Sequence, residues 1–192
     1  MYNVNKEYNK NYYGARMDFK NEVYPLMGNI FDNILKPKNV IDVGCGHGIL
    51  MDGLSCESVG IEASDEGFKQ TKERGYEAHQ IDLRLPLDFK RRFDLAISIE
   101  VAEHLEEEYA DIFVDNLISL SNRILVTASP KVEQYHYNPQ SKQYWIEKFS
   151  AKGFSLSETT NVLVETMREK IPKARGYLYN NLMFFENLSN KS

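Results

Sequence analysis

Three glycines follow an acid in the segment Asp42-Val-Gly-Cys-Gly-His-Gly48, between an apolar run that predicts a strand and one that predicts a short helix. Glycine lets a backbone turn through positive φ and approach a ligand closely, because no Cβ intervenes. A loop that binds a dinucleotide pyrophosphate has the spacing GxGxxG. This loop reads GxGxG and has Met51 where the third glycine belongs. The spacing favours a ligand without phosphates, and an ordinary turn is the alternative.

Two further acids close the next two predicted strands. Glu62 lies near the end of 58–63, at close to the roughly 20-residue offset at which an acid binds ribose hydroxyls in doubly wound folds. Asp82 lies near the end of 79–83, where its carboxylate could accept from an adenine amino group. For one acid alone, a solvated strand end is the simpler interpretation. Together with the glycine loop, the two acids predict a ligand that contains a ribose and a base.

Two histidines are candidate general bases, because imidazole titrates near neutral pH. His104 follows the predicted strand 93–100, and His136 follows the predicted strand 123–129. We expect His136 to be the base or a substrate-orienting group, with His104 second. The alternatives are a residue that shapes the cofactor pocket for His104 and an exposed loop histidine for His136. Asn138 and Tyr144 are the predicted substrate-binding residues, although packing of aromatic side chains near Tyr144 is the alternative there.

The elements that position these residues alternate along the chain. Apolar runs at 39–44, 58–63, 79–83, 93–100 and 123–129 are separated by helical segments. Nearly continuous apolar runs of this kind indicate parallel strands buried on both faces, so the predicted fold is α/β and doubly wound. In the last third, the pattern predicts a helix over 138–152, strands over 154–163 and 178–187, and a loop or frayed helix over 167–175.

Composition excludes several classes of protein. The chain has 192 residues and a formal net charge of −5, which gives no overall attraction to nucleic acid or anionic lipid. No run of 18 apolar residues is present, and Cys45 and Cys56 form neither a disulfide scaffold nor a zinc motif. These features predict a cytoplasmic protein, with nucleic acid and membrane disfavoured as partners. The oligomeric state and the choice between oxygen and nitrogen as acceptor are left open.

The motifs resemble those of the class I S-adenosylmethionine-dependent methyltransferases. VIDVGCGHG is similar to the family's first motif, GIEAS to the second and QIDL to the third, while FDLAISIEVAEHL and RILVTASP resemble its fourth and fifth strands. The resemblance implies a seven-stranded, mostly parallel sheet with helices on both faces and an antiparallel last strand. It also implies S-adenosylmethionine as cofactor, bound by Asp42, Gly44, Cys45, Gly46, Gly48, Glu62, Ala63, Asp82, Leu83, Glu100 and Tyr13.

The expected activity is methyl transfer to an oxygen or nitrogen of a small molecule or glycan, and residues 136–154 resemble a subgroup linked to glycan or secondary-metabolite pathways. ExxEH at 100–104 resembles the metal-binding signature of some enzymes that methylate RNA ends or catechol-like rings. The alternative site is therefore a divalent metal on Glu100, Glu103, His104 and His136, although the downstream histidine pair of the RNA-end enzymes is missing. A non-catalytic module that binds the cofactor is the other alternative.

The expected organisation is one methyltransferase domain over 1–192. It comprises an N-terminal arm (1–18), an N-terminal helix (19–36), a cofactor-binding core (39–130) and a substrate-side segment with a closing hairpin (131–192). Tyrosines of the arm, Tyr12 and Tyr13 among them, offer stacking surface with polar tips, so the arm is expected to fold over the cofactor.

Overall fold

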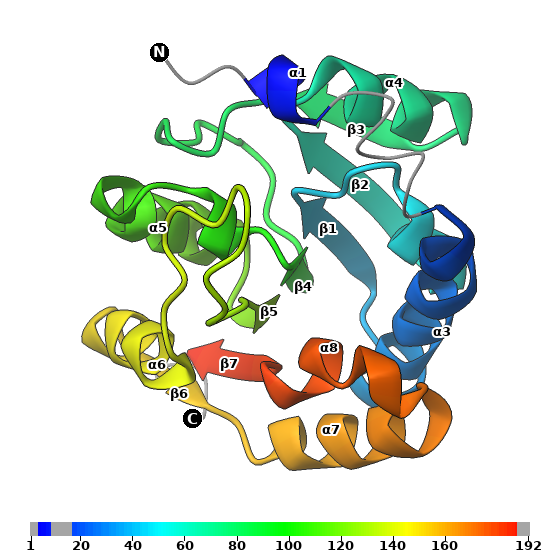
Figure 1. Ribbon diagram of the computed structural model, residues 1–192, viewed down its shortest axis with the longest axis vertical. Helices are drawn as coiled ribbons and strands as arrows, with labels where there is room; N and C mark the ends of the chain where they lie inside the picture. The colour runs from blue at the N-terminus through cyan, green and yellow to red at the C-terminus, as the bar shows by residue number, and fades with distance from the viewer. Residues whose placement is uncertain (1–3, 9–16, 188–192) are drawn as a thin grey trace. The chain divides into compact units, whose positions relative to one another are not determined.

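The computed structural model describes residues 4–8 and 17–187 (Figure 1). The chain divides into two compact units, Met1–Asp82 and Leu83–Ser192. The predicted Tyr12 and Tyr13 lie outside the described residues. Among the helices that the structure describes, none is both long and apolar enough to cross a membrane.

The first unit contains three parallel strands: β1 (Asn39–Val43), β2 (Glu57–Glu62) and β3 (Glu77–Gln80). β1 and β2 are almost entirely buried along their length, as parallel strands covered on both faces require. In the register, Asp42 is the partner of Gly60 and Glu62 is the partner of Gln80. The pairing brings the carboxyl ends of the three strands to one edge, where their polar side chains collect.

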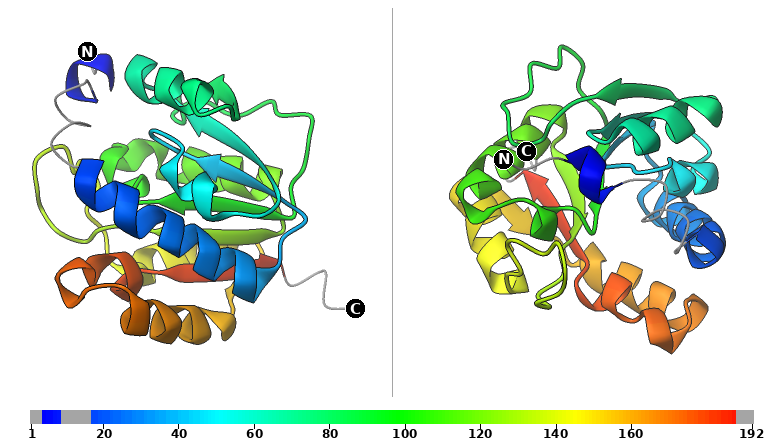
Figure 2. Two further views of the ribbon diagram at one scale, coloured as in Figure 1. Left: turned by 90° about the vertical axis from the view of Figure 1, so that its right-hand side faces the viewer. Right: turned by 45° about the horizontal axis from the view of Figure 1, so that its top comes forward.

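The first unit also contains the helices α1 (Val4–Glu7), α3 (Met17–Leu35) and α4 (Asp65–Glu73) and the 3₁₀ turn η1 (Ile49–Gly53). η1 lies between β1 and β2 along the chain, and α4 lies between β2 and β3. Figure 2 shows α3 along its length, and the helix continues through Pro25. The hydroxyl of Ser64 caps α4 by accepting from the backbone N–H of Gly67 at 3.2 Å, which satisfies one of the unpaired donors of the first turn.

α3 and η1 approach each other through two glycines. A Cβ on Gly53 would collide with the carbonyl oxygen of Pro25, and one on Gly28 would collide with that of Leu50. The obstructing atoms belong to the backbone, so no side-chain rotation could relieve either clash. Glycine is therefore required at both positions by close packing of the backbone.

The second unit contains β4 (Leu95–Ile99), β5 (Arg123–Thr127), β6 (Phe154–Leu156) and β7 (Met183–Asn187). β4 and β5 are parallel, whereas β7 runs antiparallel to both β5 and β6. Aromatic rings fill the core behind these strands. Phe149 and Phe185 stack at 4.3 Å between centroids, and the buried Trp145 meets Phe113 edge-on at 6.0 Å.

The helical elements of this unit are η2 (Ala102–His104), η3 (Glu107–Tyr109), α5 (Ala110–Leu120), α6 (Lys142–Ala151), α7 (Thr159–Lys170), η4 (Lys173–Arg175) and α8 (Tyr177–Asn180). α5 packs against α6, while α7 packs against α8 and β7 (Figure 1). Among the described residues, the sheet has seven strands in the order β3-β2-β1-β4-β5-β7-β6. The predicted α/β fold with an antiparallel last strand is thus confirmed.

The predicted closing hairpin is wrong in its extent. The strand expected over 154–163 stops at Leu156. The segment 167–175, expected to be a loop or frayed helix, contains the end of α7 and the 3₁₀ turn η4. The strand expected over 178–187 begins only at Met183, after the short helix α8. α7 buries Leu163 and Met167, which are four residues apart, so helical rather than alternating spacing governs this segment.

We expect Gly53→Ala to lower the free energy of unfolding by about 1–3 kcal/mol, because the added methyl group would force α3 and η1 apart. Chemical denaturation followed by circular dichroism measures this change. Glu22→Ala is the control, since Glu22 is exposed on the same helix α3 and its replacement should change stability little. Equal stability of Gly53→Ala and the wild type would contradict the packing argument.

Candidate functional site

The glycine loop after β1 turns through three left-handed residues. Gly44, Gly46 and Gly48 have φ of 79°, 56° and 71°, which a side chain would strain. The loop is fixed to β2, because the N–H groups of Gly44 and Cys45 both donate to the carbonyl of Ile61, at 2.8 and 3.0 Å. These contacts hold the loop at the carboxyl end of β1 and leave it without side chains at its turning points.

Glu62 connects this loop to the start of α4. Its Oε2 accepts from the N–H of Gly46 at 2.9 Å, and its Oε1 accepts from the N–H and the hydroxyl of Ser64 at 2.8 and 2.7 Å. The side chain is 8% exposed, so these three donors replace water around a buried carboxylate. Oε2 keeps capacity for one more donor, whereas Oε1 already has two.

Asp42 lies at the end of β1 and is 3% exposed. Burial, with a smaller contribution from the charge of Glu62, raises the pKa of Asp42 to about 7. Burial also raises the pKa of the neighbouring Cys45 thiol well above its usual range, which makes this cysteine unreactive. Thr71 of α4 supports the loop by donating its hydroxyl to the carbonyl of Gly46 at 2.9 Å.

The carboxyl ends of β2 and β3 are joined by further hydrogen bonds. The backbone N–H of Ile81, next to Asp82, donates to the carbonyl of Glu62 at 3.2 Å. The side-chain amide of Gln80 donates to Ala63 and to Asp65, at 3.3 and 2.6 Å. The predicted residues Ala63 and Asp82 therefore lie at the same edge as the glycine loop, in the first unit.

α1 contacts this edge through one side chain that sequence reasoning missed. The amide of Asn5 donates to the carboxylate of Asp65 at 2.8 Å, and its oxygen accepts from the backbone N–H of Asp65, also at 2.8 Å. This paired contact places α1 beside the start of α4, next to Ser64. No periodicity could have found it, because a single asparagine in a polar segment has no distinguishing pattern.

The second unit carries the other predicted residues. Glu100 follows β4 with a φ of 55°, a strained conformation for a residue with a side chain, and its N–H donates to the hydroxyl of Thr127 at 2.9 Å. Burial is the main reason that the pKa of Glu100 is raised to about 7. Leu83 is buried, and its carbonyl accepts from the amide of Asn116 at 3.1 Å.

Glu103, His104 and His136 form a cluster in this unit, with one ligand atom from each within 4.8 Å of the others. Nδ1 of His104 lies 2.9 Å from the carbonyl of Tyr135, and Nδ1 of His136 lies 2.8 Å from the carbonyl of Lys131. A carbonyl only accepts, so each Nδ1 carries a proton and each Nε2 carries the lone pair. The rings meet edge-on at 4.9 Å between centroids.

The carboxyl group of Glu103 is fully buried, and neither of its oxygens has a hydrogen-bond partner among the described residues. Burial, followed by the charge of Glu100, raises the pKa of Glu103 well above its usual range. The structure therefore brings His104 and His136 together around a buried acid. Glu100, the fourth member of the predicted metal set, is outside this cluster.

Asn138 joins the cluster through its backbone, since its N–H donates to the carbonyl of Glu103 at 3.0 Å. Its side chain is 1% exposed, and neither end of the amide has a partner in the described part of the chain. Tyr144 instead packs edge-on against Trp145 at 5.0 Å, with the ammonium of Lys148 5.0 Å from its ring centroid. The predicted Tyr13 lies outside the described residues.

Comparison with known proteins gives one family and several similar folds. A family model described as a methyltransferase domain matches residues 21–145. A ubiquinone biosynthesis O-methyltransferase of Nitrosomonas europaea is 34% identical over 99 residues, which are 45% of this chain and 42% of that protein. Magnesium protoporphyrin IX methyltransferase of Synechocystis has a TM-score of 0.61 at 18% identity, covering 78% of this chain and 80% of its own.

A third structure, the O-methyltransferase of a polyketide synthase of Brevibacillus brevis, has a TM-score of 0.60 at 17% identity and covers 97% of this chain and 80% of its own. The chain spans less than half the length of the curated relatives that it matches. The family match confirms the methyltransferase predicted from the motifs, and with it S-adenosylmethionine as the family's methyl donor.

Asp42→Asn should change how stability depends on pH. The folded wild type holds the Asp42 proton up to about pH 7, whereas the unfolded chain loses it near the ordinary aspartate pKa of 3.8. Asp42 therefore stabilises the fold fully below about pH 4, and this stabilisation is lost as the pH rises to about 7. The difference in free energy of unfolding between Asp42→Asn and the wild type should shift by several kcal/mol between about pH 4 and pH 7, since one pKa unit corresponds to about 1.4 kcal/mol.

Urea unfolding at a series of pH values measures this difference, with the exposed Asp88→Asn as control. A pH-independent difference between Asp42→Asn and the wild type would show that Asp42 has the same pKa in the folded and unfolded protein, which would contradict its raised pKa.

Proposed function

The chain belongs to the methyltransferase-domain family, and from this we propose that it transfers a methyl group from S-adenosylmethionine to a hydroxyl oxygen of a small molecule. The observation that carries this proposal is the cluster of Glu103, His104 and His136. A nitrogen acceptor needs little beyond positioning, whereas a hydroxyl is a weaker nucleophile that gains from a group able to take its proton. Two imidazoles beside a buried carboxyl, each with Nδ1 bonded to a carbonyl and Nε2 left to accept a proton, provide that group.

The glycine loop and Glu62 are the proposed nucleoside site. The cofactor supplies a methyl group already activated on a sulfonium, so this unit has only to bind and orient it. Oε2 of Glu62 can accept one ribose hydroxyl without breaking its bond to Gly46. The second hydroxyl would need Oε1 to release one of its two Ser64 contacts. Gly44, Gly46 and Gly48 let the backbone approach the ligand, with Asp42 and Asp82 beside them.

His136 is the proposed base, and His104 the group that keeps it in place. The carbonyl of Lys131 fixes the tautomer of His136, so Nε2 is the atom that can accept the hydroxyl proton. Glu103 would stabilise the imidazolium that results. The unpartnered amide of Asn138 can donate to and accept from an acceptor hydroxyl, which supports its predicted role in substrate binding.

The same cluster supports a second candidate, metal-assisted O-methylation. Metal-binding histidines usually donate their other ring N–H to a carbonyl or carboxylate, and both histidines here do so. Two imidazoles and a carboxylate would leave positions open for two neighbouring oxygens of an acceptor. A divalent cation bound there would act as a Lewis acid on the acceptor hydroxyl.

Methylation of an RNA end is supported less well. The basic stretch Lys90–Arg92 could contact phosphates, but its charges are used locally. Arg92 donates to the carbonyls of Ile118 and Ser119 at the end of α5, and the guanidinium of Arg91 lies 4.7 Å from the ring centroid of Phe93. Little positive charge therefore remains there for a nucleic acid.

Glu62→Ala should remove most of the rise in melting temperature that S-adenosylmethionine produces in the wild type. The substitution would leave a ribose hydroxyl unpaired and release the N–H of Gly46, and a ligand that binds only the folded state stabilises it. Differential scanning fluorimetry measures the rise. Glu57→Ala, at the exposed start of the same strand, is the matched control. Stabilisation of the wild type by NAD but not by S-adenosylmethionine would overturn the proposed function.

His136→Asn should lower the rate of methyl transfer to 3,4-dihydroxybenzoate by roughly 10²–10⁴-fold, the usual contribution of a general base, with cofactor affinity unchanged. Transfer of a radiolabelled methyl group gives the rate, and calorimetry gives the affinity. His79→Asn is the control, because His79 belongs to β3 and is not a member of this cluster.

Binding of Mn²⁺, followed by electron paramagnetic resonance, separates the two candidates. The metal-assisted version predicts saturable Mn²⁺ binding that Glu103→Gln abolishes, and activity that EDTA removes and Mg²⁺ or Mn²⁺ restores. The general-base version predicts neither. Full activity of both His104→Asn and His136→Asn, unaffected by EDTA, would exclude both versions.

A further inference from the structure

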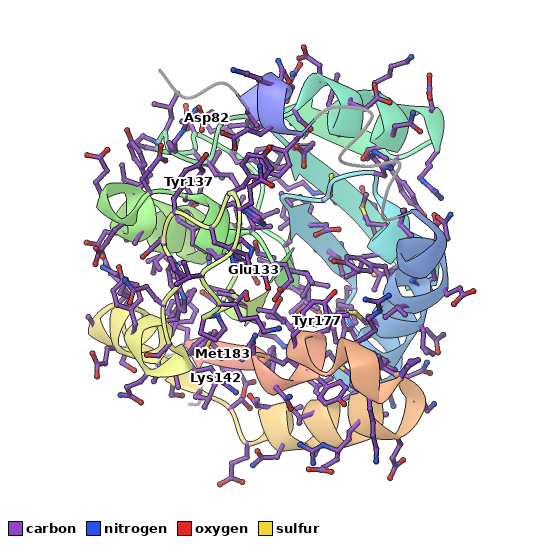
Figure 3. The ribbon with its side chains drawn as sticks, in the orientation of Figure 1. Asp82, Glu133, Tyr137, Lys142, Tyr177 and Met183 are labelled. Carbon is purple, nitrogen blue, oxygen red and sulfur yellow. The ribbon has the colours of Figure 1, made fainter. Side chains whose placement is uncertain are left out.

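The second unit contains a cavity of about 350 Å³ that none of the predicted residues explains. Lys131, on the loop after β5, lines one part of it, and Lys173, Tyr177, Asn180 and Asn181 line another. Figure 3 shows Tyr177 on α8. The volume lies at the small end of the range for ligand sites, which runs from roughly 300 to 1,000 Å³. Of its lining residues, only Pro130 and Gly176 lack a polar or charged side chain.

The charges around this cavity are positive. Two ammonium groups belong to its lining, and no carboxylate does. A third ammonium supports its wall, because Nζ of Lys142 donates to the carbonyl of Asn180 at 3.3 Å. Burial lowers the pKa of Lys142, so an anion nearby would favour its charged form. Glu133, labelled with Lys142 in Figure 3, is the acid nearest in sequence to Lys131, and its side chain is exposed to solvent.

Neutral hydrogen-bonding groups accompany these charges. Tyr177 has a phenolic hydroxyl, and Asn180 and Asn181 each have an amide that can donate two hydrogen bonds. Cationic groups combined with neutral donors suit a carboxylate or a phosphate, which only accepts hydrogen bonds when ionised.

Lys131 also connects the cavity to the Glu103–His104–His136 cluster. Its carbonyl accepts from Nδ1 of His136 at 2.8 Å, and the same residue lines the cavity. A molecule held in the cavity would therefore be anchored at the residue that orients the proposed base. This arrangement can fix one end of an acceptor while its hydroxyl lies toward the histidines.

We propose that this cavity binds an anionic group, a carboxylate or a phosphate, of the methyl acceptor, with Lys173 and Lys131 as its charged contacts. The inference rests on the proposed function, because it assigns the cavity to the acceptor of that reaction. It makes the acceptor a small anionic hydroxyl compound.

Benzoate and inorganic phosphate are the probes, and benzamide is the neutral counterpart of benzoate. Each is titrated into ¹⁵N-labelled protein saturated with S-adenosylhomocysteine, and the backbone amides of Gly176, Asn180 and Asn181 are followed by NMR. We expect saturable shifts of these amides with at least one of the two anions and none with benzamide. Whichever anion binds more tightly identifies the group as carboxylate or phosphate.

Lys173→Ala should weaken that binding roughly tenfold, as expected for loss of one charge-assisted hydrogen bond. Lys170→Ala, an exposed lysine at the end of α7 that does not line the cavity, should leave the affinity unchanged. Non-saturating shifts with both anions, equal binding of benzamide, or the same affinity in Lys173→Ala and the wild type would each overturn the proposal. Failure of S-adenosylhomocysteine to bind in the first step would count against the proposed function instead.

Discussion

Burial of carboxyl groups is the constraint on which the candidate residues of each unit depend. Asp42, Glu62, Glu100 and Glu103 stand at or just after strand ends and are partly or wholly removed from water. An ionised carboxylate in such a place must be hydrogen-bonded, paired with a cation or neutralised by a proton. Glu62 meets this requirement with three donors from Gly46 and Ser64. The other three have raised pKa values instead.

A buried acid with a raised pKa favours the arrival of positive charge. In the first unit, the positively charged methyl donor of the family would suit Asp42, which lies beside the glycine loop. In the second unit, Glu103 would be stabilised by an imidazolium or by a metal ion on His104 and His136. The energetic cost of burying these acids is thus linked to the charges that methyl transfer and proton removal would bring. The cationic methyl donor, the imidazolium or the metal ion would each compensate the cost of a buried carboxylate.

The sequence predicted the strands whose patterns are strongest and the acids at their ends. β1, β2, β4 and β5 are continuous apolar runs, and their neighbours Asp42, Glu62 and Glu100 are fixed by chain position alone. Motif spacing could not show that the hydroxyl of Ser64 donates to the carboxylate of Glu62, or that Asn5 binds Asp65, which lies 60 residues further along the chain. Such contacts depend on how loops fold.

The C-terminal region was predicted poorly for a different reason. Its segments mix aromatic and polar residues at spacings that fit both a strand and a helix, and the burial of Leu163 and Met167 shows that tertiary packing selected the helix α7.

The helices that replaced the predicted hairpin have a functional consequence. A simple hairpin over 154–187 would provide strand edges, whereas α7, η4 and α8 place Lys173, Tyr177 and Asn180 around one cavity. The region that sequence patterns described least well is therefore the one to which we assign acceptor recognition. Cofactor-binding loops are constrained by a ligand common to the whole family, but an acceptor pocket has to differ between relatives with different substrates. The cationic, hydrogen-bonding lining of this cavity therefore bears on which acceptor binds, whereas the fold that this chain shares with its relatives does not.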